Sequence, residues 1–205
     1  MPSILVATTN PAKVAEYRIL LREFGLEVCS LSDLGIDGEA DETGASFAEN
    51  ALLKARHYFE RARRPTLADD GGLEVDALGG EPGVKSHRWL GRECDAAELA
   101  DEVIRRMRGI EPARRTARLR AAAALVYETG GRQHEEVAEA SLEGLIAERR
   151  YHEILAGFPY RAILVIPERG GRYLAELGEN EAAALSQRRV ALARLKPVLQ
   201  KLART

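Results

Sequence analysis

The sequence predicts an α/β fold, and the order of its first three elements carries this prediction. Residues 3–8 form a short uncharged apolar run, which is typical of a strand buried on both faces. A helical pattern follows, and residues 27–31 have the character of a second strand. A strand, a tight loop, a helix and a strand in this order favour a sheet with helices packed on it.

The first helix is bounded by a proline and a glycine. Pro11 suits the first turn of a helix, and Gly25 is a stop signal. Between them the apolar residues recur at helical spacing, at Val14, Tyr17, Leu20, Leu21 and Phe24. A second helix is expected over about 46–63, with Ser46 as its cap and Glu49 three residues later as the partner in a capping box.

The remaining elements alternate between strands and helices. Arg115, Arg118 and Arg120 lie near the start of a predicted hairpin, where a solvated rim is expected rather than a binding patch. A strand is predicted at 65–69, before a glycine-dense segment, and a helix at 95–108. A hairpin of 115–127 and 132–142, turned at 129–131, and a strand at 161–167, ended by Pro167, follow. One helix is predicted from about 180 to the end, and its buried residues are Leu185, Ala191, Leu192, Leu195 and Leu199.

Composition limits the possible functions. The 205 residues suffice for one large domain or two packed lobes. A net charge of −2 argues against a general nucleic-acid coat, which needs a cationic excess. Cys29 and Cys94 form no CxxC pair, so a disulfide framework is unsupported and a reducing cytoplasm is the expected compartment. The N-terminal residues resemble neither a signal peptide nor a membrane span, so no membrane partner is expected.

The loop Thr8–Lys13 is the first candidate site. A strand that runs directly into a helix leaves free backbone N–H groups at the helix N-terminus, and these attract anions. Thr8, Thr9, Asn10 and Lys13 add further donors and a positive charge, which suits a polyphosphate. The loop lacks the glycines and the GK[ST] ending of a P-loop. The alternative is that Thr9 or Asn10 only caps the helix.

Two acidic stretches supply the second and third candidates. Glu42 lies in Asp41–Gly44, and Lys54 on the following helix could reach a phosphate or pair with Glu49 in solvent. The other stretch ends an apolar run in Asp69 and Asp70, which presents hard oxygen ligands at the carboxyl edge of a strand. One of these carboxylates could hold Mg²⁺ and polarise a water. The alternative is a turn, because Asp-Gly is also a turn signal.

The order and spacing of the three candidates resemble a known family. It comprises the house-cleaning nucleoside triphosphate pyrophosphatases that act on inosine, xanthosine and related purine triphosphates. The resemblance extends over nearly the whole chain. Its strongest blocks are TTNPAKVAEY at 8–17, DETGASFAENALLKA at 41–55 and LADDGGLEVDALGGEPGVKSHRW at 67–89.

The resemblance implies an elongated mixed-sheet α/β fold, with two lobes and a central cleft in one domain over 1–205. It also implies a homodimer that cleaves a nucleoside triphosphate substrate, such as ITP, dITP or XTP, to the monophosphate and pyrophosphate with Mg²⁺. By position, Thr8, Asn10 and Lys13 match the phosphate-binding loop, and Lys54 matches a phosphate-contacting lysine. Glu42 and Asp70 match the metal-binding acids, with Asp70 also the proton acceptor, and Gly71 stands where the family usually has Ser.

The departures from the family concern the residues that would read the base. The family loop FGYDP appears as residues 158–162, in which Phe158 and Tyr160 survive but Arg161 replaces an acid. The glycine-rich approach to this loop is replaced by the more helix-prone residues 151–156. The family pattern S-H-R appears as Ser186, Gln187 and Arg188, and a lysine expected four residues earlier is Ala182.

Two explanations of these departures remain open. Specificity has shifted to another or modified nucleotide whose base offers acceptors to Arg161, or the loop is degenerate and the enzyme is weak or broad. A non-enzymatic nucleotide-binding protein is a further alternative, which the retained Glu42 and Asp70 disfavour. A Maf-like pyrophosphatase is disfavoured because TTNPAK does not fit the N-terminal loop of that family.

Overall fold

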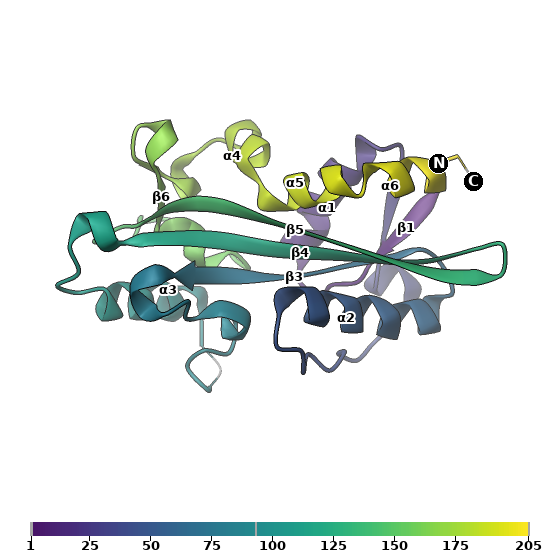
Figure 1. The fold of residues 1–205 in the computed structure, drawn as a ribbon, viewed down its shortest axis with the longest axis horizontal. Helices are drawn as coiled ribbons and strands as arrows, with labels where there is room; N and C mark the ends of the chain where they lie inside the picture. Colours follow the sequence, from purple (N-terminus) through teal and green to yellow (C-terminus); the bar gives the residue numbers. More distant parts are fainter. Residues whose placement is uncertain (1, 93, 205) are drawn as a thin grey trace. The chain divides into compact units, whose positions relative to one another are not determined.

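A computed structural model describes residues 2–92 and 94–204 of the chain (Figure 1). Within these residues one mixed sheet has the strand order β2-β1-β3-β4-β5-β6-β7, which confirms the predicted α/β class. The strands are β1 (Ser3–Val6), β2 (Glu27–Ser30), β3 (Thr66–Val75), β4 (Thr116–Thr129), β5 (Arg132–Ile146), β6 (Leu164–Ile166) and β7 (Arg172–Tyr173). The α-helices are α1 (Pro11–Arg22), α2 (Phe47–Ala62), α3 (Ala96–Arg106), α4 (Glu179–Leu185), α5 (Gln187–Arg194) and α6 (Lys196–Leu202).

The sheet contains both parallel and antiparallel pairs of strands. β1 runs parallel to β2, with Ile4 opposite Val28, and parallel to β3, with Leu5 opposite Thr66. β6 pairs antiparallel with both β5 and β7. Parallel neighbours need a crossover, and α1 supplies it between β1 and β2.

The chain forms two compact units. The first unit comprises the residues up to Asp70, Ala121–Ala140 and the chain from Arg188 onward. The second unit comprises Gly71–Arg120 and Ser141–Gln187. Strands β3, β4 and β5 each contribute residues to both units.

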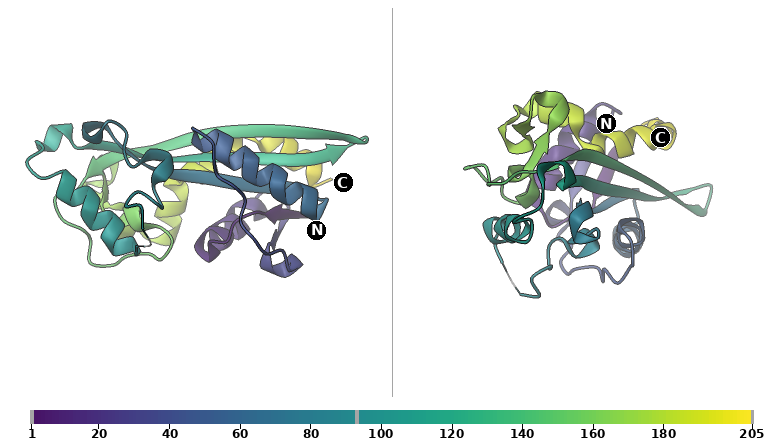
Figure 2. Two further views of the ribbon diagram at one scale, coloured as in Figure 1. Left: turned by 90° about the horizontal axis from the view of Figure 1, so that it is seen from below. Right: turned by 60° about the vertical axis from the view of Figure 1, so that its left-hand side comes forward.

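In the first unit, helices cover both faces of the strands. Figures 1 and 2 show α2 on one face and α5 and α6 on the other. The core on the side of α5 and α6 also takes up the apolar side of α1, in agreement with the predicted helical stripe. This core includes Ile4, Val6, Tyr17, Leu20, Leu21, Leu67, Leu125, Ala191, Leu192, Leu195 and Leu199.

The second unit has a core of its own around α3. Leu99, Ala100 and Val103 of α3 pack with the carboxyl-terminal part of β3 and with β6. Asp95 caps α3, and Glu98 completes the capping box, so the predicted start of this helix is confirmed. Arg115 contradicts its predicted place on a solvated rim, because it is 5% exposed and donates to the carbonyls of Met107, Ile146 and Ala147.

Three predicted elements differ from the structure. β3 continues to Val75, so Asp69 and Asp70 lie within the strand rather than at its carboxyl edge or in a turn. The prediction of a single C-terminal helix is wrong, because Ser186 leaves the helical conformation and a new helix begins at Lys196, with Pro197 in its first turn, which gives α4, α5 and α6. The predicted strand 161–167 shortens to β6, and residues 159–162 before it form a 3₁₀ turn. Residues 151–156 contain no helix.

Helix boundaries elsewhere agree with the sequence signals. Gly25 adopts a φ of 76° just beyond α1, in the left-handed region that glycine tolerates. Ser46 caps α2 by accepting from the N–H of Glu49, but the Glu49 carboxylate accepts from Ala45 rather than from Ser46. No helix among the described residues is long and apolar enough to span a bilayer.

Candidate active site

The N-terminus of α1 is organised by the side chain of Asn10. Its Oδ1 accepts from the N–H of Ala12 at 2.9 Å and from the N–H of Lys13 at 3.3 Å. Thr8 Oγ1 accepts from the N–H of Asn10 at 3.2 Å, and Thr9 is exposed. Asn10 therefore is the helix cap, as the simpler sequence interpretation held, and with Thr8 it holds the loop in one conformation.

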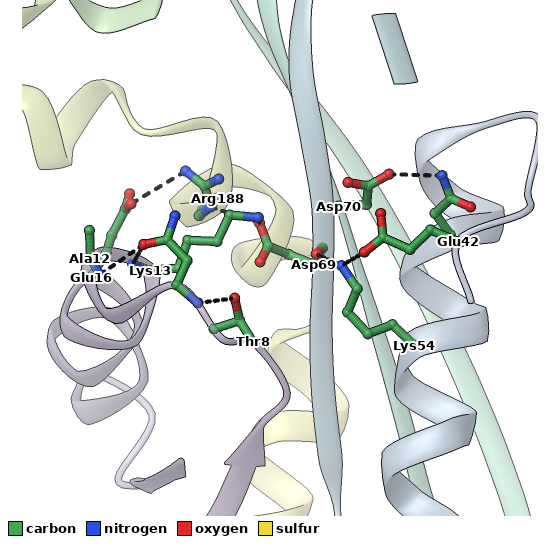
Figure 3. A network of polar contacts seen from close by, with 11 residues as sticks. Thr8, Ala12, Lys13, Glu16, Glu42, Lys54, Asp69, Asp70 and Arg188 are labelled. Carbon is green, nitrogen blue, oxygen red and sulfur yellow. Dashed lines mark hydrogen bonds and ion pairs between the residues drawn. The ribbon is translucent and has the colours of Figure 1, made fainter. Parts of the chain in front are cut away.

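Lys13 turns away from solvent and pairs with Asp69 of β3 (Figure 3). The Lys13 Nζ lies 3.1 Å from Asp69 Oδ2, and the two side chains are 7% and 0% exposed. Burial lowers the pKa of Lys13 although Asp69 acts in the opposite direction. Burial alone would raise the pKa of Asp69, but the charges of Lys13 and Arg188 outweigh it and hold that pKa well below its usual range.

Arg188 binds the same carboxylate from α5. Its Nε donates to Asp69 Oδ2 at 2.9 Å, and its Nη1 donates to Glu16 at 3.3 Å. Arg188 is 5% exposed. Although the sequence predicts that this residue reads the base, its side chain is bound to two acids of the first unit. Two cations and two carboxylates thus form a nearly neutral buried cluster that joins α1, β3 and α5.

Glu42, Lys54 and Asp70 lie on the other side of β3, beside α2 (Figure 3). Lys54 Nζ is 2.5 Å from Glu42 Oε1 and donates to the backbone carbonyl of Asp69 at 3.3 Å. Lys54 therefore pairs with Glu42 and not with Glu49, the partner that the sequence had offered as the alternative to a phosphate. Burial lowers the pKa of Lys54, but the charge and hydrogen bond of Glu42, together with the charges of Asp69 and Asp70, outweigh burial, so the pKa is raised.

Asp70 has an environment unlike that of its neighbour in the chain. It is 5% exposed, and the Nδ2 of Asn50 donates to its Oδ2 at 3.1 Å. Burial raises the pKa of Asp70, Lys54 lowers it, and the charge of Glu42 raises it further. A raised pKa makes this carboxylate a better proton acceptor than an ordinary aspartate.

The acids on this side of β3 suit a divalent cation only in part. Glu42 and Asp70 are hard oxygen donors, and the pKa of Asp70 is raised first by burial and further by the like charge of Glu42. Among residues 2–92 and 94–204 no group of three or more acidic, histidine or cysteine side chains could hold a metal. Magnesium commonly takes only one or two carboxylates and completes its coordination with water and substrate phosphates, so the pair fits that ion.

Apart from Arg188, the residues predicted to read the base belong to the second unit. The Arg161 guanidinium lies over the Phe158 ring, 4.2 Å from its centroid. Tyr160 is 4% exposed, and its hydroxyl donates to the Ser86 carbonyl at 2.6 Å, so this ring is part of the core. Ser186 and Gln187 are buried, and Gly71 is buried within β3.

Three residues of this network have no role in the sequence interpretation. The sequence presents Asp69 only together with Asp70, and it indicates no partner for Glu16 and no role for Asn50. For Asn50 a signal existed, because it lies four residues before Lys54 and therefore on the same face of α2. No comparable pattern identifies the long-range pairing of Glu16 with Arg188.

Comparison with known proteins identifies the family of the chain. The model of the Ham1 family matches residues 4–198. The chain belongs to the Ham1 family. A solved Ham1 protein from Coxiella burnetii is 33% identical, and it superposes with a TM-score of 0.83 over 98% of this chain and 100% of that chain.

Curated relatives of this Ham1 protein bear the name dITP/XTP pyrophosphatase. The relative from Geobacillus kaustophilus is 42% identical over 95% of this chain and 93% of its own length. The relative from Bacillus subtilis is 37% identical over 98% of both chains. A solved dITP/XTP pyrophosphatase from Mycobacterium abscessus is 42% identical, with a TM-score of 0.73 over 95% of this chain and 99% of that chain.

Proposed function

We propose that this Ham1 protein hydrolyses non-standard purine nucleoside triphosphates such as dITP, ITP and XTP to the monophosphate and pyrophosphate. One observation carries the proposal: Glu42 and Asp70 lie together beside Lys54, in the same unit as Lys13 and the N-terminus of α1. The names of the relatives supply the substrate class. Residues 1–205 would act as one pyrophosphatase domain.

The chain's own residues account for the reaction as follows. A water oxygen attacks the α-phosphorus, its proton passes to Asp70, and the bond from the α-phosphorus to the oxygen of the leaving pyrophosphate breaks. The raised pKa of Asp70 supports its role as the acceptor. Lys13 and Lys54 neutralise charge on the departing pyrophosphate, and the positive end of the α1 helix dipole attracts it.

A divalent cation, which we propose to be Mg²⁺, would be held by Glu42 and Asp70. When bound, it supplies charge neutralisation and helps to lower the pKa of the attacking water. The 2.5 Å pair of Lys54 with Glu42 shows that this carboxylate attracts a cation. We further propose a homodimer in the cytoplasm, and light scattering of the purified protein tests the dimer.

Base recognition is proposed to depend on Phe158 and Arg161. Phe158 is half-buried and lies under the Arg161 guanidinium, whereas Tyr160 is committed to the core. Arg161 offers only donors, so it would favour a base edge with acceptors. This observation supports the second candidate, in which the same reaction acts on a different or modified nucleotide.

The decisive experiment is a panel of triphosphates with pyrophosphate release as the readout. We expect dITP, ITP and XTP to be hydrolysed faster than the standard triphosphates, and chelation of divalent cations to stop release. A preference for a modified pyrimidine would instead support the shifted specificity. Absence of pyrophosphate release from every triphosphate would leave the nucleotide-binding alternative.

Asp70→Asn tests the proton acceptor. The variant keeps the size of the side chain but loses most of its basicity, so we expect turnover to fall about 100-fold or more while nucleotide binding persists. Asp37→Asn, an exposed acid of the same unit, is the control and should retain full activity. Near-normal turnover of Asp70→Asn would remove Asp70 from this role.

A further inference from the structure

Asn50 is a fully buried polar side chain that the proposed reaction does not use. It lies in the first turns of α2 and is 0% exposed. Its Oδ1 accepts from the N–H of Gly44 at 2.8 Å, and its Nδ2 donates to Asp70 Oδ2 at 3.1 Å. One amide therefore connects a backbone position two residues after Glu42 with the side chain of Asp70.

The direction of these two hydrogen bonds follows from the chemistry of the partners. A backbone N–H can only donate, so the amide atom that faces Gly44 must be the carbonyl oxygen. The NH₂ group of Asn50 must then face Asp70, whose carboxylate oxygen can accept. This arrangement restricts the rotation of the Asp70 carboxylate and assigns one of its oxygens to Asn50.

The loop that carries Glu42 packs directly against the same turn of α2. A Cβ atom at Gly44 would lie 2.7 Å from Glu49 Cβ and 2.8 Å from Asn50 Oδ1, closer than real atoms approach. One helical turn after Asn50, Lys54 holds the Glu42 carboxylate at 2.5 Å. The face of α2 thus contacts this loop at two points, Gly44 and Glu42.

We propose that Asn50 is a positioning residue that holds the carboxylates of Glu42 and Asp70 in the mutual geometry the reaction requires. The proposal rests on the proposed function, because it assigns these two acids to the metal and the water. The negative charges of Glu42 and Asp70 repel each other. The neutral amide of Asn50 opposes their separation, because it is bonded both to the loop that carries Glu42 and to Asp70. A residue that only stabilised α2 would affect folding without affecting the two acids.

Asn50→Ala, with Asn50→Ser as a second variant of different polarity, tests the proposal. Loss of a partner behind a metal ligand typically costs about 10- to 100-fold in metal affinity or activity. We therefore expect kcat to fall by about this factor while KM for the nucleotide changes little. Calorimetric titration of the protein with Mg²⁺ alone should show weaker binding by a similar factor.

Ser46→Ala is the matched control on the same helix. Its hydroxyl accepts from the N–H of Glu49 in the cap, so its loss should lower the stability of α2 without touching either acid. We expect this variant to keep the wild-type kcat and Mg²⁺ affinity. An equal loss of kcat in Ser46→Ala and Asn50→Ala would overturn the proposal in favour of simple helix stabilisation.

Two further outcomes separate the positioning role from the proposed function. Wild-type kcat and Mg²⁺ affinity in folded Asn50→Ala or Asn50→Ser would overturn the positioning role and leave the pyrophosphatase intact. Absence of pyrophosphate release by the wild type would instead defeat the proposed function. In that case hydrogen exchange at the Gly44 amide still reports on the bond, since its protection should fall in the Asn50 variants alone.

Discussion

Asp69 and Asp70 are neighbours in the chain whose carboxyl pKa values shift in opposite directions. Lys13 and Arg188 lower the pKa of Asp69, against the effect of its burial. Burial and the charge of Glu42 raise the pKa of Asp70. Folding therefore stabilises the ionised form of Asp69, whereas it makes ionisation of Asp70 less favourable than in the unfolded chain.

This contrast predicts opposite effects of the same substitution on stability. Asp69→Asn leaves the buried cations of Lys13 and Arg188 without their shared counterion, which should cost about 3–5 kcal/mol of unfolding free energy. Asp70→Asn removes a disfavoured charge, so the metal-free protein should be at least as stable as the wild type. Urea unfolding at neutral pH measures both, and a larger loss for Asp70→Asn than for Asp69→Asn would contradict this account.

The sequence identified most polar residues of the first unit but not their partners. Lys13, Lys54, Glu42 and Asp70 were predicted from residue type and from the resemblance, and they lie in one unit. The pairings of Lys13 with Asp69 and of Lys54 with Glu42 join segments distant in sequence, and only the fold brings them together.

At the scale of elements, β3 shows why glycine is an ambiguous signal. The sequence Asp-Asp-Gly-Gly indicated a turn or strand end, but the strand continues through both glycines. Gly72 allows a close approach rather than a turn, because a Cβ atom there would lie 2.0 Å from Ser86 Oγ. Ser86 in turn accepts from the N–H of Leu73 and donates to the Gly83 carbonyl.

Gly72→Ala should therefore destabilise the second unit. The added methyl group would displace Ser86, whose carbonyl accepts from Tyr160, and such overpacking typically costs about 1–3 kcal/mol. Thermal unfolding measures the effect. Gly178→Ala is the control, because apart from its chain neighbours no atom in the described part of the chain would lie within 4 Å of a Cβ at Gly178, and its φ is −60°. Equal losses in the two variants would show that packing against Ser86 is not the cause.

At the scale of the whole molecule, carboxylates with lowered pKa values occur in both units. They include Asp33 and Asp69 in the first unit and Asp76, Glu98 and Glu102 in the second. Hydrogen bonds from Arg105 and Arg106 lower the pKa of Glu102 from 4.5 to about 2. A carboxylate of this kind stabilises the fold above its unfolded pKa and loses that contribution as the pH falls through its folded pKa.

We accordingly expect acid to destabilise the protein progressively. For Glu102 the loss should occur between pH 4.5 and about 2, and the midpoint of thermal unfolding should fall over this interval. Glu102→Gln removes one of these carboxylates, so the midpoint of thermal unfolding of this variant should fall less over the same pH interval. An unfolding midpoint that rises on acidification would contradict the assigned directions.

The fold class was predictable because alternating strand and helix patterns are local properties of the sequence. The division into two units was left open by chain length alone. It depends on which apolar residues of β3, β4 and β5 pack with which helices, and this information is not local. The C-terminal helices illustrate the same limit, since their buried stripe was predicted while the breaks at Ser186 and Pro197 were missed.

The pleat of β3 gives its two consecutive acids separate surroundings. Successive side chains of a strand point to opposite faces, so Asp69 meets Lys13 and Asp70 meets Asn50. Deletion of one residue between Thr66 and Ala68 would turn each acid to the opposite face of the sheet, away from the partners that it now has. Evolution can therefore exchange side chains along this segment far more readily than it can change the segment's length.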